Sequence, residues 1–206
     1  EPLVSILIPT KDRIDLLKTC VDSILKITRY KNFEILILDN ESVEEESNKY
    51  FEQVSKIKNI NVIGVKGAFN YSNINNYGVK QTKGSILAFI NNDIEITHPE
   101  WLNEMVSHAI RKEIGCVGAK LLYPNRTIQH AGVIIGIGGV AGHSFKNYPP
   151  NHSGYKHRLQ LVQNYSAVTA ACLVVQKEIF EQVDGFDEEN LKVAFNDVDF
   201  CLKVLK

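Results

Sequence analysis

Strand-like and helix-like segments alternate along the first half of the chain, and this alternation constrains the fold more than any other feature. Short apolar runs rich in β-branched residues occur at 4–9, 33–39, 60–65 and 85–91. Segments of helical length separate them. Repeats of this spacing predict right-handed strand–helix–strand units and a mostly parallel sheet with helices on both faces. The predicted fold class is therefore α/β.

The segments between these runs carry helix signals. Residues 13–27 repeat apolar side chains at helical spacing, and residues 43–57 are charged and helix-like. Ser72 is expected to cap a third helix that ends near Gly84. Pro99 fits the first turn of a fourth helix, which we expect to run to about residue 112.

The second half of the chain has a different pattern. A fifth strand is predicted at 116–123, and residues 128–145 mix glycines with β-branched residues, which predicts hairpins or a bent strand with a flexible loop. An extended stretch within 159–176 precedes a short helix at 177–183, and another helix starts near residue 195. We interpret the change in composition near residue 124 as a boundary between two halves of a single domain, 1–123 and 124–206.

Composition excludes several classes of protein. The 206 residues carry a formal net charge of -1, which gives no general attraction to nucleic acid or acidic lipid. No apolar run is long enough to span a bilayer. Four scattered cysteines without a CxxC pair favour reduced thiols and a cytoplasmic location. Because Glu1-Pro2 leads straight into a strand and the last helix has no Gly or Pro terminator, we expect the chain to be a piece of a longer protein.

Three of the predicted strands end in polar sequences. These are "PTKDR" at 9–13, "DNES" at 39–42 and "NNDIE" at 91–95. Ligands of open α/β sheets bind beyond the carboxyl ends of the strands. The three polar ends therefore predict a binding site at one edge of the sheet.

Each polar end has a functional and a local interpretation. Asp93 in Asn91-Asn92-Asp93, with Glu95 two residues on, suits a Mg²⁺ ion shared with substrate phosphates, but the same residues also suit a turn before the Pro99 helix. Asp39-Asn40 suits recognition of a ribose hydroxyl or a base edge, and equally an Asx turn.

Two later groups are further candidates. Asp197 and Asp199 fall in the first turn of a predicted helix, where an ionised carboxylate is favoured; Asp197 could act as a general base or, with Asn196 as N-cap, be an ordinary helix-start residue. His130 is interpreted as a polar loop residue. His143, after the glycines at 136–142, is left open as a ligand-binding residue. The glycines themselves do not form a dinucleotide-binding fingerprint.

Taken in order, four segments resemble glycosyltransferase family 2, the inverting enzymes of GT-A fold, and the likeness covers nearly the whole chain. The segments are "VSILIPTKDR" (4–13), "FEILILDNES" (33–42), "FNYSNINNYGVKQTKGSILAFINNDIEITHPEWL" (69–102) and "GFDEENLKVAFNDVDFCLKV" (185–204). The sequence is most similar to the bacterial rhamnosyltransferase-like and O-antigen branch.

The resemblance implies roles for individual residues. It implies that Asp197 is the catalytic base and that Asp93 holds a divalent cation, Mg²⁺ or Mn²⁺, with Asn91, Glu95 and His143 as further candidate ligands. The implied donor-nucleotide site comprises Pro9, Thr10, Lys11, Arg13, Asp39, Asn40, Asn76 and Asn92.

The implied reaction transfers a hexosyl or deoxyhexosyl group, with inversion, from a UDP- or dTDP-sugar to a hydroxyl of a glycan or lipid-linked acceptor in bacterial surface polysaccharide synthesis. Residues 1–123 would bind the nucleotide-sugar, and residues 124–206 would face the acceptor, with 136–142 as a lid. The expected location is the cytoplasm, at the inner face of the membrane through the rest of the protein.

Three residues depart from the family pattern: Asn91 replaces the first Asp of the metal motif, Asn40 makes the second-strand pair Asp-Asn, and Asn196 replaces the Glu before the catalytic Asp. Asparagines at acidic positions would suit a non-catalytic nucleotide- or carbohydrate-binding domain, although both Asp93 and Asp197 are retained. A sugar-phosphate nucleotidyltransferase is a further alternative, but "PTKDR" lacks the glycines of its first loop.

Overall fold

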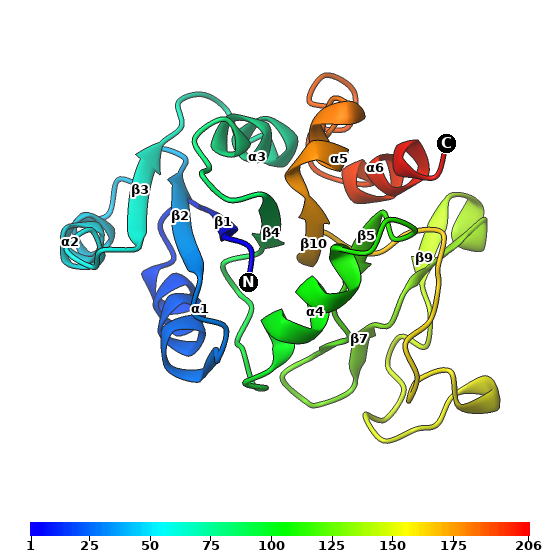
Figure 1. The fold of residues 1–206 in the computed structure, drawn as a ribbon. Coiled ribbons are helices and arrows are strands. Elements are labelled where there is room, and N and C mark those ends of the chain that lie inside the picture. The colour runs from blue at the N-terminus through cyan, green and yellow to red at the C-terminus, as the bar shows by residue number, and fades with distance from the viewer.

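A six-stranded sheet forms the centre of the computed structural model, which describes residues 1–206 (Figure 1). Its strand order is β3-β2-β1-β4-β10-β5. The strands are β1 (Val4–Thr10), β2 (Phe33–Asp39), β3 (Ile60–Gly64), β4 (Ile86–Ile90), β5 (Cys116–Gly118) and β10 (Cys172–Gln176). The first four are parallel, and β10 runs antiparallel to both β4 and β5. The predicted mostly parallel α/β sheet is confirmed.

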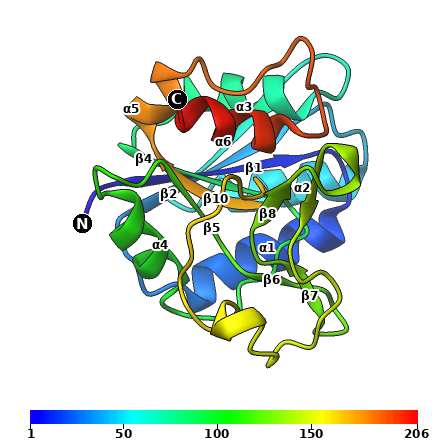
Figure 2. The ribbon, with the colours of Figure 1, turned by 90° about the vertical axis from the view of Figure 1, so that its right-hand side faces the viewer.

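Helices cover both faces of this sheet (Figure 2). They are α1 (Ile14–Ile27), α2 (Glu45–Val54), α3 (Tyr71–Val79), α4 (Trp101–Ala109), α5 (Lys177–Gln182) and α6 (Asn196–Val204). One apolar core lies between the sheet and α1, α2 and α4, and the other between the sheet and α3, α5 and α6. Within β1, Ile6 and Ile8 face the first core and Leu7 faces the second. A strand buried on both faces has to be almost wholly apolar, which explains the nearly continuous apolar runs in the sequence.

Four expected boundaries were wrong. One is the end of the third helix, since α3 ends at Val79 rather than near Gly84. Asn70, not Ser72, caps α3: its side chain accepts from the Asn73 N–H at 3.0 Å, whereas the Ser72 hydroxyl donates to Leu191 O at 2.6 Å. Pro99 lies in a turn ahead of α4 rather than inside it. The strand expected at 116–123 is divided, because only its first three residues pair with β10.

Between β5 and β10 the chain forms short pairs of strands outside the main sheet. β6 (Leu121–Leu122) pairs with β7 (Ile128–His130), and β8 (Val133–Ile135) pairs with β9 (Ala141–His143) across a 3₁₀ turn, η1 (Ile137–Gly139). A second 3₁₀ turn, η2, spans Tyr155–His157. The hairpin expected from the glycine-rich segment is present. In Figure 2 these pairs lie beside the edge of the main sheet.

The fold brings the carboxyl ends of β1, β2 and β4 to one edge of the sheet, because these strands are parallel neighbours. No helix in the structure has the length and hydropathy needed to cross a membrane. The polar sequences that follow β1, β2 and β4 lie together at this edge.

Candidate active site

The loops after β1 and β4 meet through their side chains. Asn92 Nδ2 donates to Thr10 Oγ1 at 3.1 Å, and the Asn40 N–H donates to Thr10 O at 2.8 Å. Thr10 and the preceding Pro9 are themselves buried in the sheet. The structure thus brings together the polar ends of β1, β2 and β4, as the sequence predicted.

Asp12 organises the loop after β1, a role that its place in "PTKDR" does not indicate. Its N–H donates to Ser42 Oγ at 2.7 Å, and its Oδ1 accepts from the N–H groups of Val43 and Glu44, each at 2.9 Å. Asp12 and Arg13 both adopt left-handed backbone conformations, with φ of 51° and 49°. The carboxylate therefore fixes a tight turn against the start of α2.

The two basic residues of this turn remain accessible. Lys11 is exposed and forms no hydrogen bond or ion pair within the chain. Arg13 pairs with Asp15 at 3.2 Å, but both side chains are largely exposed. A surface ion pair of this kind contributes little, so the guanidinium can exchange its partner for a bound anion at small cost.

Asp39 and Asn40 are placed differently from each other. Asp39 is partly exposed, and its Oδ1 accepts from the Ser42 N–H at 3.0 Å in an Asx-type turn. Asn40 is 1% exposed, and its Nδ2 donates to Val65 O and Gly67 O at 3.0 and 2.9 Å. Of this pair only Asp39 offers an oxygen to a ligand. Asn40, which we expected to read a base, instead holds the loop after β3.

Asn76 also differs from the expectation that it faces the nucleotide. Its Nδ2 donates to Phe186 O at 2.8 Å and to Glu188 Oε2 at 3.0 Å. Its Oδ1 accepts from the Phe186 N–H at 3.1 Å. The whole amide is thus engaged, and it fastens α3 to the loop between α5 and α6.

The Asn91-Asn92-Asp93 segment both forms a turn and exposes a carboxylate. The Ile94 N–H donates to Asn91 O at 3.2 Å, so the turn interpretation is confirmed. Asp93 and Glu95 are exposed and bind no other group of the chain. The structure holds no group of three or more His, Cys, Asp or Glu residues arranged to bind a metal. A lone exposed carboxylate nonetheless fits a hard cation that takes its other ligands from substrate phosphates and water.

Asp197 lies in the first turn of α6 and is held by two backbone groups. Its Oδ2 accepts from the Ala170 N–H at 3.1 Å and its Oδ1 from the Val198 N–H at 2.8 Å. Asn196 is not the N-cap, since α6 begins at this residue after Phe195, whose φ is 61°. The Asn196 amide is buried and donates to Ser72 Oγ at 3.1 Å, which ties α6 to α3.

His130 and His143 form a pair that the sequence did not reveal. Their Nδ1 atoms lie 2.7 Å apart, and the ring planes are nearly perpendicular. His130 is buried rather than a loop residue in solvent, and burial together with His143 lowers its pKa to about 3. Burial also lowers the pKa of His143, against the opposing effect of Asp197. Their spacing of thirteen residues carries no local signal, because a hairpin brings them together.

A cavity of about 220 Å³ contains both His143 and Asp197. Its remaining lining residues are Val133, Ala141, Gly142, Val193, Ala194, Phe195, Asn196 and Val198. It lies between the β8–β9 hairpin and the start of α6. This small cavity therefore places a carboxylate and an imidazole in contact with the same space.

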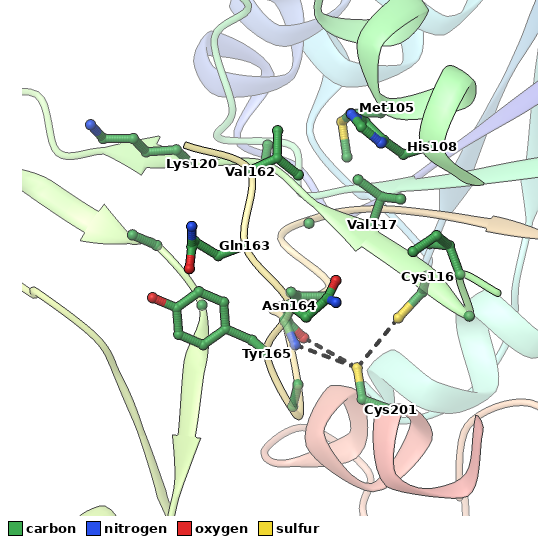
Figure 3. Close-up of a pocket in the computed structure, with 18 of the residues that line it drawn as sticks. Met105, His108, Cys116, Val117, Lys120, Val162, Gln163, Asn164, Tyr165 and Cys201 are labelled. Carbon is green, nitrogen blue, oxygen red and sulfur yellow. Dashed lines mark hydrogen bonds between the residues drawn. The ribbon is translucent and has the colours of Figure 1, made fainter. Parts of the chain in front are cut away.

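A larger cavity, of about 570 Å³, lies between α4, β5, the end of α6 and the segment 158–168 (Figure 3). Tyr165 and Lys120 border it, and the Sγ atoms of Cys116 and Cys201 lie 3.6 Å apart at its other side. All four cysteines are free thiols, as expected. None of the predicted site residues lines this cavity. Two of them, Asp197 and His143, line the smaller cavity.

Comparison with known sequences identifies the family. Residues 5–184 match the profile of "Glycosyl transferase family 2". The chain is 53% identical over 204 residues to "Uncharacterized protein y4gI" of Sinorhizobium fredii, and 43% identical over 205 residues to "O-antigen biosynthesis protein RfbC" of Myxococcus xanthus. Each match covers 98% of this chain but only 22% and 16% of those relatives, so the chain spans less than a quarter of their length.

Solved structures show the same fold at low sequence identity. A mannosyltransferase from Pyrobaculum calidifontis in complex with GDP-Man and Mn²⁺ has a TM-score of 0.71 at 14% identity, covering 99% of this chain and 52% of that one. GalNAc-T7 with UDP, GalNAc and Mn²⁺ has a TM-score of 0.75 at 15% identity, covering 98% and 40%. These neighbours support the GT-A architecture, and the sequence match shows that the chain belongs to glycosyltransferase family 2.

Proposed function

We propose that this chain is a catalytic domain that transfers a hexose or deoxyhexose, with inversion, from a UDP- or dTDP-sugar to a hydroxyl group of a glycan or lipid-linked acceptor. Family membership supports glycosyl transfer in general. The 43% identity to a relative named for O-antigen biosynthesis supports a role in bacterial surface polysaccharide synthesis. The geometry of the site supports separate roles for a donor end, around Asp93, and an acceptor end, around Asp197.

One observation carries the proposal: the segment 170–171 joins Asp197 to the Asn91-Asn92-Asp93 turn. The Ala170 N–H donates to Asp197 Oδ2, and the next residue, Ala171, accepts from the Asn91 N–H at 3.0 Å. The candidate base and the candidate metal-binding turn are thus anchored on adjacent residues. A donor diphosphate and an acceptor hydroxyl bound at the two positions would be close enough to react.

The donor end combines positive side chains with an exposed carboxylate. Lys11 and Arg13 project from the turn after β1 and would bind the diphosphate, and Asp39 would accept from a ribose hydroxyl. Asp93 would hold a divalent cation together with phosphate oxygens, and the cation would neutralise charge that develops on the leaving diphosphate. Two structural neighbours were solved with Mn²⁺.

The acceptor end is built around Asp197. In the proposed reaction the acceptor oxygen forms a bond to the anomeric carbon as the bond to the diphosphate oxygen breaks on the opposite face. Asp197 takes the hydroxyl proton. Its two backbone hydrogen bonds orient the carboxylate, and inversion follows from attack opposite the leaving group. The β8–β9 hairpin, with its exposed glycine turn at 136–139, would act as a lid over this space.

Nucleotide binding and donor turnover together test the proposal. UDP, dTDP and GDP are added with and without Mn²⁺, and the midpoint of thermal unfolding is measured. One nucleotide should stabilise the protein, and more strongly with Mn²⁺. Slow hydrolysis of the matching nucleotide-sugar should then release free nucleotide. Binding without any turnover, even with acceptors present, would identify a non-catalytic binding domain.

A further inference from the structure

The hydrogen bonds around His130 determine where its proton lies. Its Nε2 faces two backbone N–H groups, those of Gly132 at 3.3 Å and Thr169 at 3.4 Å. Backbone N–H groups only donate, so this nitrogen has to be the unprotonated acceptor. The single proton of the neutral ring therefore lies on Nδ1.

This proton in turn fixes the tautomer of His143. Because the Nδ1 atoms of the two rings are 2.7 Å apart, His130 Nδ1–H donates to His143 Nδ1. A neutral His143 that accepts at Nδ1 carries its own proton on Nε2. A charged His143 would instead bring two N–H groups face to face. Burial, which lowers the pKa of both rings, favours the same neutral state.

The arrangement leaves one donor pointing away from the pair. His143 Nε2 binds no other group of the protein, and the residue lines the 220 Å³ cavity together with Asp197. An Nε2 that carries a proton has no lone pair for a metal ion. The geometry thus separates His143 from the role of cation ligand that the sequence left open.

We propose that His130 is a positioning residue that locks His143 as a neutral Nε2–H donor, and that this donor binds an oxygen of the acceptor sugar next to the hydroxyl that Asp197 deprotonates. A carboxylate accepts from one hydroxyl while the imidazole donates to its neighbour. The pair therefore suits a carbohydrate acceptor with two adjacent oxygens, and Phe195 offers an apolar wall of the same cavity. The inference rests on the proposed function for the acceptor and for Asp197 as the base, whereas the tautomers of the two rings follow from their hydrogen bonds alone.

The first test is spectroscopic and needs no substrate. Imidazole ¹⁵N chemical shifts of the wild-type protein at pH 7.5 should show His130 protonated at Nδ1 and His143 protonated at Nε2. Asn carries an amide near the Nδ1 position, so His130→Asn should preserve the His143 tautomer, whereas His130→Leu should release it to a mixture. A His143 that is charged, or protonated at Nδ1, in the wild-type protein overturns the proposal even where a variant fails to fold.

The second test addresses what the donor binds. Gln places an amide near the Nε2 position and Asn does not, so His143→Gln and His143→Asn form a matched pair. Methyl glycosides of hexoses and 6-deoxyhexoses serve as acceptor probes. We expect His143→Asn to raise the acceptor KM about 3- to 10-fold, the effect of one neutral hydrogen bond, and His143→Gln to change it less.

Mn²⁺-dependent affinity for UDP, dTDP and GDP, measured by calorimetry, should be the same in both His143 variants and the wild type. A loss of more than about tenfold in His143→Asn would make His143 a cation ligand and overturn the proposal. If the tautomers are as expected but no nucleotide-sugar is turned over, the proposed function fails while the assignment of the pair stands.

Discussion

Asn40 Nδ2 lies 2.9 Å from the carbonyl oxygen of Gly67, so the residue that follows β2 closes the loop that follows β3. The same nitrogen donates to Val65 O at 3.0 Å. The Asn40 Oδ1 is buried and has no partner within the protein. Both amide hydrogens thus bind the backbone, which gives Asn40 a structural role at the carboxyl end of β2.

Asn40→Asp should therefore destabilise the fold. A carboxylate at this position would face two carbonyl oxygens that have lost their donor, and each unpaired buried group costs about 1–3 kcal/mol. The free energy of unfolding in urea measures the loss, and Asp39→Asn, at the partly exposed neighbour, is the matched control. An unchanged stability with an altered preference among UDP, dTDP and GDP would return Asn40 to the base-reading role expected from the sequence.

Asp93→Ala should abolish the Mn²⁺-dependent part of nucleotide affinity and leave the fold intact. The Asp93 side chain is exposed and forms no hydrogen bond or ion pair within the chain, so its removal should change stability by less than about 0.5 kcal/mol. Calorimetry of UDP, dTDP and GDP with and without Mn²⁺ measures the affinity. Glu95→Ala, two residues away and equally exposed, is the control and should retain most of it. Unchanged affinity in Asp93→Ala would exclude Asp93 from the cation site.

The first half of the fold was predictable because its signals are local. A strand such as β1 can be read from its almost wholly apolar run, and the buried side of α1 can be read from apolar residues repeated at helical spacing. The short strands β6 to β9 carry no such signal, since each is two or three residues long and gains its structure from a distant partner. The division of the expected strand at 116–123 follows from the same dependence.

The candidate site was predictable in part for a similar reason. Asp93 and Asp197 follow from motifs whose order and spacing are visible in the chain. The structural roles of Asn40 and Asn76 depend on partners 25 to 112 residues away, which a single sequence does not display. The contact between His130 and His143 is hidden in the same way. Polar residue type alone cannot separate an amide that binds a ligand from one that binds the backbone.

Stability should fall in mild acid because of His130. Burial and His143 lower the pKa of His130 from 6.5 to about 3. The neighbouring charges of Asp197 and Lys146 act on His143, whose pKa Asp197 raises and Lys146 lowers. Between pH 3 and pH 6.5, His130 therefore binds a proton in the unfolded chain but not in the folded one. The stabilisation is therefore complete above about pH 6.5 and is lost as the pH falls towards 3, by up to about 1.4 kcal/mol per pH unit.

Urea unfolding of the wild type and of His130→Asn, from pH 7.5 down to 5, measures this contribution. The variant keeps the donor to His143 but has no titrating group at this position. Its stability should therefore fall less steeply than that of the wild type. Parallel curves for the two proteins would show that His130 titrates normally in the folded state.

Asp197→Asn should separate binding from chemistry. An asparagine at this position keeps the size of the side chain and one oxygen for the Val198 N–H, so the protein should still fold. Its amide cannot take a proton from the acceptor hydroxyl, and loss of a general base costs about 10²- to 10⁴-fold in rate. The cost in stability should be confined to the contact with the Ala170 N–H, which an Nδ2 group cannot accept.

Asp199→Asn is the matched control, because Asp199 lies in the same helical turn and pairs with Lys203 at 3.3 Å rather than facing the cavity. Glycosyl transfer and nucleotide affinity are measured for both variants and the wild type. Transfer should fall only in Asp197→Asn, with the affinity for nucleotide and Mn²⁺ preserved. Near-normal transfer by this variant would remove Asp197 as the base. Parallel loss of nucleotide affinity would instead assign it to the donor side, because a proton acceptor that acts only on the acceptor hydroxyl has no contact with the bound nucleotide.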